Sequence, residues 1–428
     1  MADRGGLTVA LRTLGCKVNR AESEAIAAEL LGVGVRISEE DEASVIVINT
    51  CTVTGEADAK ARKAVRQALA APAGPVVVVT GCLAALDRDA LAALGQRVIV
   101  EADKGRVAAI VTELLGAKVS HGGDHVPALR TGDAAFRHRV ALKVEDGCDA
   151  FCSYCIVPYA RGVPRAVPLS DIASQAAALA AAGTREIVLT GINIGRYDDD
   201  GLDLADVIGT VAATGVARIR LSSVEPLDLT PRLLAEMAAT PAFCAHLHVP
   251  LQAGSDAVLS AMGRTYTAAR FAERIEAARE ALLGLVLTTD VLAGFPGETA
   301  EQAAETLEFC QRAGFSKLHV FRYSRRPGTA AAVRPDQVPD AEKAARAGAL
   351  RDLSAHLAAR HAADRLGGQA EVLVERVTAG VDSTPIAEGT TRDYLRVRFS
   401  AEGASVGELA AVRLTRVEGD KVLGERLV

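Results

Sequence analysis

An α/β fold followed by a small all-β module is predicted by two patterns in the sequence. Apolar, β-branched runs alternate with segments of helical periodicity over most of the 428 residues, and near residue 367 this alternation gives way to short β-branched segments broken by glycine. The chain is 49% hydrophobic but only 4% aromatic, with no tryptophan, so aliphatic side chains must fill its core. Its length suggests two or three domains.

Residues 1–116 are expected to form a parallel-sheet α/β domain. Continuous apolar runs separated by helices are typical of strands that are buried on both faces of a parallel sheet. The expected strands lie at residues 7–14, 43–49, 75–80 and 98–100, and the expected helices at residues 22–31, 57–69 and 107–115. Residues 117–135 contain several glycines and lack periodicity, which indicates a linker.

Strand–helix alternation resumes in residues 136–366. Six strands separated by helices predict a (βα)6 partial barrel, a fold that places its chemistry at the carboxyl ends of the strands. The expected strands lie at residues 140–144, 186–190, 219–222, 247–250, 285–292 and 317–321, and the helices at residues 169–182, 204–213, 230–237, 268–283 and 300–312, with one long connecting helix at residues 340–366.

Residues 367–428 form the third expected unit. Short β-branched segments are separated by glycines, which predicts a small all-β barrel of four or five strands. The expected strands lie at residues 371–376, 394–399, 408–416 and 422–427.

Composition excludes several classes of protein. No run of 18 apolar residues occurs, which excludes a transmembrane helix, and the N-terminus lacks the apolar segment of a secretory signal. We therefore expect a cytoplasmic protein without a membrane partner. A formal net charge of −6 excludes binding to nucleic acid through bulk basicity and leaves local basic patches as the means of contact. Eight cysteines in such a chain favour metal ligands or redox groups over disulfides.

A C-x3-C-x2-C loop follows the first strand of the predicted barrel, with the cysteines Cys148, Cys152 and Cys155. Three thiolates on one tight loop can each bind one iron of a [4Fe–4S] cluster and leave the fourth iron open to a small chelator. The alternative is a structural zinc site. Such a site needs four ligands, and no histidine nearby in the sequence supplies the fourth.

A second set of cysteines is spread over the N-terminal segment. Cys16, Cys51 and Cys82 each come immediately after a predicted strand. Because the carboxyl ends of parallel strands emerge at one edge of a sheet, we expect these three thiols to converge on a second cluster. Gly15 and Gly81 stand directly before two of them and allow the backbone to approach closely.

The C-x3-C-x2-C loop resembles that of the radical S-adenosylmethionine (SAM) superfamily. With the three-cysteine N-terminal domain and a C-terminal β module that resembles a TRAM domain, the chain is similar to the methylthiotransferase family over nearly its whole length. The resemblance implies two [4Fe–4S] clusters and SAM used twice. One SAM gives its methyl group to sulfur, and the other gives the 5′-deoxyadenosyl radical that activates a C–H bond.

Four short sequence motifs resemble those of the family branch that modifies threonylcarbamoyladenosine in tRNA. These motifs are Thr13-Leu-Gly-Cys-Lys-Val-Asn19, Asn49-Thr-Cys-Thr-Val-Thr54, Pro158-Tyr-Ala-Arg-Gly162 and Arg220-Leu-Ser-Ser-Val-Glu-Pro226. The resemblance implies that the C2–H of N6-threonylcarbamoyladenosine at position 37, next to the anticodon, is replaced by a methylthio group. The alternatives are the same chemistry on isopentenyladenosine tRNA or on an aspartate of a ribosomal protein, and, in another class, a non-catalytic iron–sulfur RNA-binding redox sensor.

The resemblance also implies positions for SAM. The superfamily places an aromatic residue in the cysteine loop and holds the SAM amino group at the end of the second barrel strand. Further polar residues end the third, fourth and fifth strands. The candidate SAM-binding residues are therefore Tyr154, Thr190, Gly191, Asn193, Ser223, Glu225, Gln252 and Asp290.

Contact with the tRNA anticodon loop is expected from local basic patches. Two such patches, free of acids in the sequence, border the predicted reactive edge, and a third lies on one strand of the C-terminal module. The candidate residues are Lys60, Arg62 and Lys63, then Arg322, Arg325 and Arg326, then Arg396 and Arg398. The chemistry further requires an electron donor and a sulfur donor, which the sequence does not identify.

Overall fold

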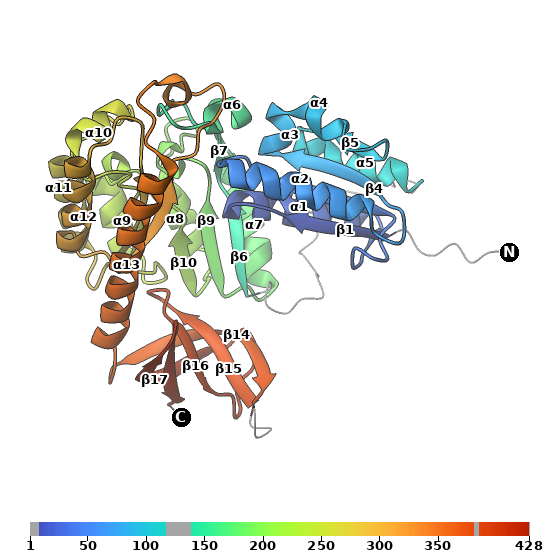
Figure 1. Ribbon diagram of the computed structural model, residues 1–428. Coiled ribbons are helices and arrows are strands. Elements are labelled where there is room, and N and C mark those ends of the chain that lie inside the picture. Colours follow the sequence, from blue (N-terminus) through green and yellow to red (C-terminus); the bar gives the residue numbers. More distant parts are fainter. Residues whose placement is uncertain (1–7, 117–137, 381–384, 428) are drawn as a thin grey trace.

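The computed structural model describes residues 8–116, 138–380 and 385–427, and shows three units in chain order (Figure 1). A blue N-terminal α/β unit stands beside a larger green-to-yellow α/β unit, and an orange-red β-barrel lies below the latter. The expected linker, residues 117–135, lies outside the described residues. Among the described helices, none combines the length and the apolar character that a membrane crossing requires.

The N-terminal unit is a five-stranded parallel sheet in the order β2-β1-β3-β4-β5. Apolar side chains cover both of its faces, one beneath α2 and the other beneath α1 and α5. The short elements β2, α3 and α4 are not visible in the sequence pattern. The bounds are β1 (Thr8–Thr13), α1 (Lys17–Gly32), β2 (Arg36–Ile37), β3 (Val45–Thr50), α2 (Gly55–Leu69), β4 (Val76–Gly81), α3 (Cys82–Leu86), α4 (Arg88–Ala92), β5 (Val98–Val100) and α5 (Val107–Leu114).

The central unit contains the six expected strands in two parallel sheets of three, β10-β9-β6 and β11-β12-β13. A single parallel bridge from Ile219 to Phe243 joins the two sheets at a seam, so the six strands form one open, curved array. The strand bounds are β6 (Arg139–Lys143), β9 (Glu186–Thr190), β10 (Arg218–Leu221), β11 (His246–His248), β12 (Val286–Ala293) and β13 (Lys317–Arg322). The predicted partial barrel is confirmed.

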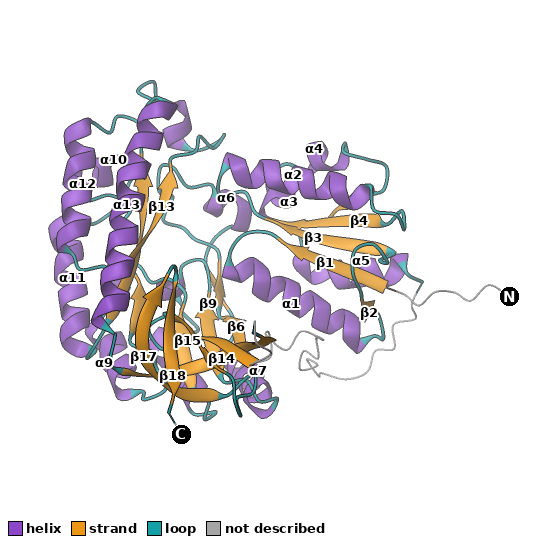
Figure 2. Ribbon diagram, turned by 60° about the horizontal axis from the view of Figure 1, so that its bottom comes forward, coloured by secondary structure: helices purple, strands orange, loops and turns teal. Residues whose placement is uncertain are grey.

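Helices cover the outer face of this array, and short elements surround the cysteine loop. The covering helices are α7 (Leu169–Ala181), α8 (Leu204–Ala212), α9 (Pro231–Ala239), α11 (Ala268–Ala281) and α12 (Ala300–Arg312). The short elements are β7 (Glu145–Asp146), α6 (Val157–Arg161), β8 (Arg165–Ala166) and α10 (Asp256–Ala261). Among the described strands, β6 pairs with β9 alone, and α1 of the N-terminal unit lies along its other side (Figure 2), which protects an otherwise open sheet edge.

The long helix α13 (Asp340–Asp364) leads into a closed barrel of order β14-β15-β16-β18-β17. Its strands are β14 (Gln369–Ala379), β15 (Pro385–Thr391), β16 (Arg396–Ser400), β17 (Leu409–Glu418) and β18 (Lys421–Arg426). The sequence pattern missed β15 because that strand is polar and contains Gly389. A Cβ at Gly389 would lie 2.1 Å from the carbonyl oxygen of Leu373, so close packing against β14 requires glycine there.

Two buried arginines of β10 attach the C-terminal barrel to the central unit. Arg220 donates to the carbonyl oxygens of Thr391 (2.6 Å) and Arg392 (2.7 Å), and its Nε donates to Glu186 (2.7 Å). Arg218 donates to the carbonyl oxygens of Glu371 (2.6 Å) and Thr390 (3.0 Å). Although burial opposes ionisation of Glu186, the charges of Arg220, Arg139 and Arg218 hold its pKa below the ordinary value.

We predict that Arg220→Met lowers the free energy of unfolding by about 3–5 kcal/mol, because the change weakens the compensation of a buried carboxylate and removes the hydrogen bonds to the carbonyl oxygens of Thr391 and Arg392. Urea denaturation followed by circular dichroism measures this loss. Arg232→Met is the matched control, since the ion pairs of Arg232 with Asp203 and Asp206 are exposed, and it should cost less than about 1 kcal/mol. Equal losses in the two variants would contradict the assigned role of Arg220.

Candidate active site

Three cysteines meet at one edge of the N-terminal sheet. Cys16, Cys51 and Cys82 follow β1, β3 and β4, which are neighbours in the sheet. Cys51 and Cys82 are buried, whereas Cys16 is exposed. Burial raises the pKa of Cys51, and the negative charges of Cys82 and Cys16 raise it further. The three cysteines therefore share one edge of the sheet, at the ends of three neighbouring strands.

The two glycines before these cysteines are required by crowding. Gly15 has φ +103°, and a Cβ there would lie 2.6 Å from the Cβ of Cys51. Gly81 has φ +93°, and a Cβ there would lie 2.4 Å from the side-chain oxygen of Asn49. Both positions thus combine a left-handed backbone with a close approach that only glycine allows.

A buried asparagine ties the loops of Cys16 and Cys51 together. The side-chain amide of Asn19 donates to the carbonyl oxygens of Leu14 (2.8 Å) and Thr50 (2.9 Å). Asn49 in turn donates to the carbonyl oxygen of Asn19 (2.8 Å). Helix α1 begins at Lys17, five residues before the expected start, because this polar first turn is buried in the network and shows no apolar periodicity.

The second set, Cys148, Cys152 and Cys155, lies on the loop after β7 and is half-buried. The backbone N–H of Cys148 donates to the carbonyl oxygen of Gly162 (2.9 Å), and that of Ser153 donates to the carbonyl oxygen of Met262 (2.8 Å). Burial raises the pKa of Cys155 to about 12, and the charges of Cys152 and Cys148 act in the same direction. A bound metal ion would favour the thiolate form of Cys155.

The spacing of both cysteine sets fits a cluster better than a single ion. Sulfurs that bind one tetrahedral zinc lie about 3.8 Å apart, as follows from a Zn–S bond of about 2.3 Å. Among the described residues, neither set has its sulfurs all within 4.8 Å of one another. Wider spacing is expected when each sulfur binds a different iron of one cluster. The three cysteines of each set are therefore candidate ligands of an iron–sulfur cluster.

One arginine lies beside each cysteine set, and each is buried. Arg264 donates to the sulfur of Cys152 (3.3 Å) and to the hydroxyl of Tyr266 (3.1 Å), and it pairs with Glu225. Arg161 donates through Nε to the sulfur of Cys82 (3.2 Å). Charge-assisted hydrogen bonds of this kind stabilise thiolates.

Arg161 also joins the two α/β units. It lies in α6, just after the C-x3-C-x2-C loop, and donates to Asp146 (2.8 Å) from the same unit. It also donates to two residues of the N-terminal unit, the carboxylate of Glu22 (2.9 Å) and the side-chain oxygen of Asn19 (2.7 Å). The side chains of Arg161 and Glu22 are 2% and 4% exposed. The helix that follows one cysteine set is thus bonded directly to a cysteine of the other.

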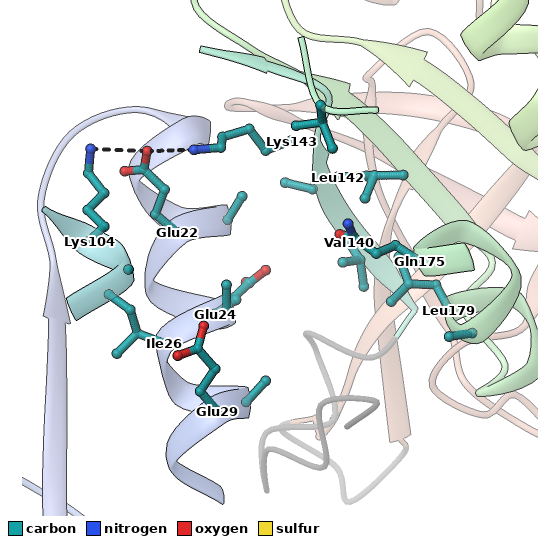
Figure 3. A pocket seen from close by; sticks show the side chains of 17 residues that line it. Glu22, Glu24, Ile26, Glu29, Lys104, Val140, Leu142, Lys143, Gln175 and Leu179 are labelled. Atoms are coloured by element: carbon teal, nitrogen blue, oxygen red, sulfur yellow. Dashed lines mark hydrogen bonds and ion pairs between the residues drawn. The ribbon is translucent and has the colours of Figure 1, made fainter. Parts of the chain in front are cut away.

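Two lysines also pair with Glu22 at this junction. Lys104 and Lys143 each place Nζ 3.2 Å from the same oxygen of Glu22, one from each side (Figure 3). A mainly apolar cavity of about 290 Å³ continues from there between α1 and the strand β6 with helix α7. Its lining contains none of the cysteines and none of the candidate SAM-binding residues. This cavity is a gap at the junction of two units rather than the reactive centre.

A second junction lies at the start of α2. Buried Arg326 pairs with Asp58 (2.8 Å) and donates to the hydroxyl of Thr52 (2.7 Å), next to Cys51. Arg322 pairs with Glu56 (2.9 Å). The segment that sequence analysis proposed for tRNA contact therefore also fixes the N-terminal unit to the end of β13.

Four buried side-chain oxygens at the ends of β7, β9 and β10 have no hydrogen-bond partner within the described part of the chain. They belong to Glu145, Thr190, Asn193 and Ser222. The other oxygen of Glu145 accepts from the backbone N–H groups of Ile192 and Asn193, both at 2.8 Å. Burial raises the pKa of Glu145 to about 7. Unpaired buried acceptors are costly, so this group is arranged for a ligand that carries donors or positive charge.

The other candidate SAM-binding residues surround the same end of the barrel. Tyr154 lies within the cysteine loop, and Ser223 lies with Glu225 in the loop after β10. Gln252 has φ +68°, and its backbone N–H donates to the carbonyl oxygen of Asp290 (2.9 Å). Gly191 allows the close approach of Glu145, since a Cβ there would lie 2.7 Å from the carboxylate.

Asp290 belongs to a polar group on the inner strands β11, β12 and β13. Its oxygen lies 3.1 Å from Nε2 of His248 and 3.8 Å from Nδ1 of His319. Thr288 contacts both His248 (2.9 Å) and His246 (3.3 Å). These side chains face the interior of the open barrel, below the cysteine loop.

Some of the expected tRNA-binding residues are exposed, whereas others pair with acids or with a backbone carbonyl. Lys60 and Lys63 are exposed on α2, whereas Arg62 pairs with Asp87. Arg325 donates to the carbonyl oxygen of Ala332 (2.5 Å). On the C-terminal barrel, Arg396 pairs with Asp420 and Arg398 with Glu388.

A basic cavity of about 960 Å³ lies between α1, the strands β6 and β9, and the C-terminal barrel. Its acids are Glu375 and Glu388. Its cations come from all three units and were not recognised as a group in the sequence: Lys17, Arg20, Arg139, Arg376, Arg396 and Lys421. The lining thus has six cations and two acids. Because Arg139 pairs with Glu186 and Arg396 with Asp420 outside the lining, the surplus of positive charge is smaller than this count.

Sequence reasoning missed three residues of the site: Glu145, Arg161 and Arg264. For two of these residues, the sequence position gives a weak indication of a role. Glu145 is an acid at the end of an apolar strand, directly before the cysteine loop, and Arg161 stands six residues after Cys155 in a short word. Arg264 is more than a hundred residues from Cys152, and only the fold brings them together.

Comparison with known proteins adds two family matches. Residues 142–310 match the radical SAM superfamily, and residues 8–101 match the uncharacterized protein family UPF0004. Among solved structures, the radical S-adenosylmethionine methyltransferase TsrM from Kitasatospora setae is similar with a TM-score of 0.54 and 15% identity, covering 77% of each chain. This likeness supports the fold.

Two curated relatives match almost end to end. The threonylcarbamoyladenosine tRNA methylthiotransferase MtaB of Bacillus subtilis is 36% identical, covering 96% of this chain and 94% of the relative. The tRNA-2-methylthio-N(6)-dimethylallyladenosine synthase of an Anaeromyxobacter species (strain K) is 34% identical, covering 97% of this chain and 93% of the relative.

We predict that Arg161→Met loosens the junction of the two α/β units, because Asp146 and Glu22 lose their shared buried cation. Hydrogen–deuterium exchange of the apoprotein should show exchange in α1 and α3 faster by at least about tenfold, which corresponds to a loss of about 1.4 kcal/mol. Arg270→Met, which removes an exposed pair with Glu273, is the control and should leave both helices protected. Unchanged protection in Arg161→Met would refute the assigned role.

Proposed function

The chain belongs to the threonylcarbamoyladenosine tRNA methylthiotransferase branch of the radical SAM methylthiotransferases, and we propose that it replaces the C2–H of N6-threonylcarbamoyladenosine, next to the anticodon of tRNA, by a methylthio group. One observation carries the proposal. Two three-cysteine sets, each suited to an iron–sulfur cluster, adjoin one another through Arg161. A single-cluster enzyme would have no need of the second set.

We assign Cys148, Cys152 and Cys155 to the cluster that binds SAM, and Cys16, Cys51 and Cys82 to an auxiliary [4Fe–4S] cluster. When bound, the first cluster with SAM supplies the radical chemistry that an unactivated aromatic C–H requires, and the second supplies sulfur. The contribution of the protein is to hold the cluster ligands in position. Arg264 and Arg161 stabilise one thiolate in each set, and Asn19 with Asn49 hold the loops that carry Cys16 and Cys51.

SAM is placed against the unpaired oxygens of Glu145, Thr190, Asn193 and Ser222. Its ammonium group offers the positive charge and the donors that these acceptors lack. We assign Glu145 as the ionic partner of that ammonium group, because its free oxygen is buried beside Asn193 and a bound cation offsets the cost of ionising it. Tyr154, Gly191, Ser223, Glu225, Gln252 and Asp290 complete the proposed surroundings of SAM and the target base.

tRNA is bound by the basic cavity between the three units together with the exposed lysines of α2. This cavity borders α1, which begins directly after Cys16, so phosphates held there keep the anticodon loop near the auxiliary set. The target base must leave its stack to reach the barrel interior. Electron-donor and sulfur-donor proteins are further partners, and the reducing conditions that free thiols need place the enzyme in the cytoplasm.

We predict that the anaerobically reconstituted chain binds about eight irons and forms 2-methylthio-N6-threonylcarbamoyladenosine in tRNA from a strain that lacks this modification. Cys148→Ala should abolish formation of 5′-deoxyadenosine. Cys16→Ala should keep about four irons and 5′-deoxyadenosine formation but lose sulfur transfer. Nucleoside mass spectrometry and iron analysis measure these outcomes, with Cys310→Ala as the control because Cys310 is buried away from both sets.

The same experiment separates the alternatives. Methylthiolation of isopentenyladenosine instead would assign the chain to the dimethylallyladenosine synthases, to which it is also similar. Zinc in place of iron, without SAM turnover, would identify a binding protein and overturn the proposal. Sulfur transfer by Cys16→Ala would overturn the assignment of the auxiliary set.

We predict that Glu145→Gln weakens SAM binding by about 10- to 100-fold, because it removes a buried charge opposite the SAM ammonium group while a side-chain oxygen remains for the N–H groups of Ile192 and Asn193. Equilibrium dialysis of the iron-loaded protein measures the dissociation constant. Glu101→Gln, at the end of β5 and away from the barrel, is the control. Equal affinities of wild type and Glu145→Gln would exclude the ionic contact.

A further inference from the structure

Lys17 is a cation with an unusual position. It is the first residue of α1, directly after Cys16, and its side chain is exposed. Its Nζ lies 5.7 Å from the ring centroid of Tyr394, which stands between β15 and β16 of the C-terminal barrel. Among the described residues, no carboxylate lies within ion-pair distance of this Nζ.

The arginines that share the Tyr394 ring with Lys17 are already neutralised. Arg220 and Arg139 lie 3.9 Å and 4.9 Å from the ring centroid. Both bond to the same oxygen of Glu186, at 2.7 Å and 2.9 Å. Arg139 also pairs with Glu375 (3.0 Å), so two carboxylates accompany the two arginines. Lys17 is therefore the member of this group whose charge is available to a ligand.

Lys17 also adjoins the polar group inside the barrel. The ring of His246 packs edge-on against Tyr394, with centroids 4.6 Å apart. Burial lowers the pKa of His246 well below its ordinary value, and the positive charges of Arg220, His248 and Lys17 lower it further. The charge of Lys17 acts on His319 in the same direction. The ammonium group is thus within electrostatic reach of the strands that face the target base.

The threonylcarbamoyl group carries a free carboxylate, since threonine is attached through its nitrogen. With an ordinary pKa of about 3.5, this carboxylate is charged at neutral pH and must meet a cation if it is to leave water. C2 and the carbon that bears N6 flank N1 on the same edge of the adenine ring. When C2 is turned toward the cysteines, the N6 substituent therefore lies to one side of them, within reach of a long side chain that starts beside Cys16.

We propose that Lys17 is a specificity-determining residue that pairs with the carboxylate of the threonylcarbamoyl group, an inference that rests on the proposed function. A site built to pair a charged group discriminates strongly against an analogue that lacks it, because the site's own charge is then left without a partner. Lys17 thereby distinguishes an acidic N6 substituent from a neutral one.

The test uses the full-length, iron-loaded protein and two anticodon stem-loop RNAs. One carries N6-threonylcarbamoyladenosine, and the other is identical except that a carboxamide replaces the threonine carboxylate. Wild type should prefer the acidic RNA by about 30-fold in kcat/KM and in affinity, the size expected of a charge-assisted hydrogen bond. Lys17→Gln should lose this preference, and Lys17→Arg, which keeps the charge, should retain most of it.

Arg376→Gln is the matched control, because Arg376 is exposed and lines the same cavity from β14. Because Arg376 is expected to contact phosphate, its loss should weaken binding of both RNAs by the same factor and leave the preference for the acidic RNA intact. Iron content and 5′-deoxyadenosine formation, measured for every variant, show whether the loop of Cys16 has been disturbed.

Three outcomes decide the proposal. Loss of preference in Lys17→Gln with normal iron content supports it. If Lys17→Gln bound both RNAs more weakly by the same factor, Lys17 would be a phosphate contact. If Lys17→Gln bound and modified both RNAs as wild type does, Lys17 would have no part in recognition. Either result overturns the inference. Absence of any methylthiolation of the acidic RNA by wild type would instead refute the proposed function.

Discussion

The buried guanidinium of Arg161 is the contact on which the arrangement of the site depends. It starts from the helix that follows one cysteine set and reaches a thiol of the other, and it is compensated by Glu22 from the N-terminal unit and Asp146 from the central unit. Charges this deeply buried cannot separate without a large cost in solvation, so the two units are held in one relative position. A reaction between groups bound at the two cysteine sets would need such a fixed position, because small displacements of reacting atoms reduce rates severely.

Near this junction, buried polar groups of the described residues lack hydrogen-bond partners where a ligand is expected, whereas a buried carboxylate at the opposite end of the barrel is paired. Glu145 keeps one oxygen paired to two backbone N–H groups and leaves the other without a partner among the described residues. By contrast, Glu186 at the opposite end of the barrel is compensated by three arginines that also hold the C-terminal barrel. Both carboxylates are fully buried, yet one has its pKa raised to about 7 and the other has it lowered. The difference marks one end of the barrel as a binding site and the other as a structural joint.

Much of this could be predicted from the sequence because the governing signals are local. Strand periodicity located all six strands of the central unit, and the cysteines at strand ends indicated that parallel topology would bring Cys16, Cys51 and Cys82 together. The misses have physical reasons. Strand β15 is polar and depends on Gly389 fitting against β14, and the first turn of α1 is buried through asparagine hydrogen bonds rather than through apolar contacts. Arg264 acts on Cys152 across a sequence separation of 112 residues, for which no local pattern exists.

The charge distribution explains how an acidic chain can act on RNA. Several arginines that looked available in the sequence are neutralised within the fold, as Arg326 is by Asp58 and Arg398 by Glu388. A smaller surplus of positive charge remains where the three units meet, at the cavity whose lining includes Lys17 and Arg376. The positions of these cations are set by α1 and the C-terminal barrel, so RNA drawn to them would meet the protein beside the first turn of α1. In the proposed function, the contacts that join the units would therefore also decide where the substrate lies.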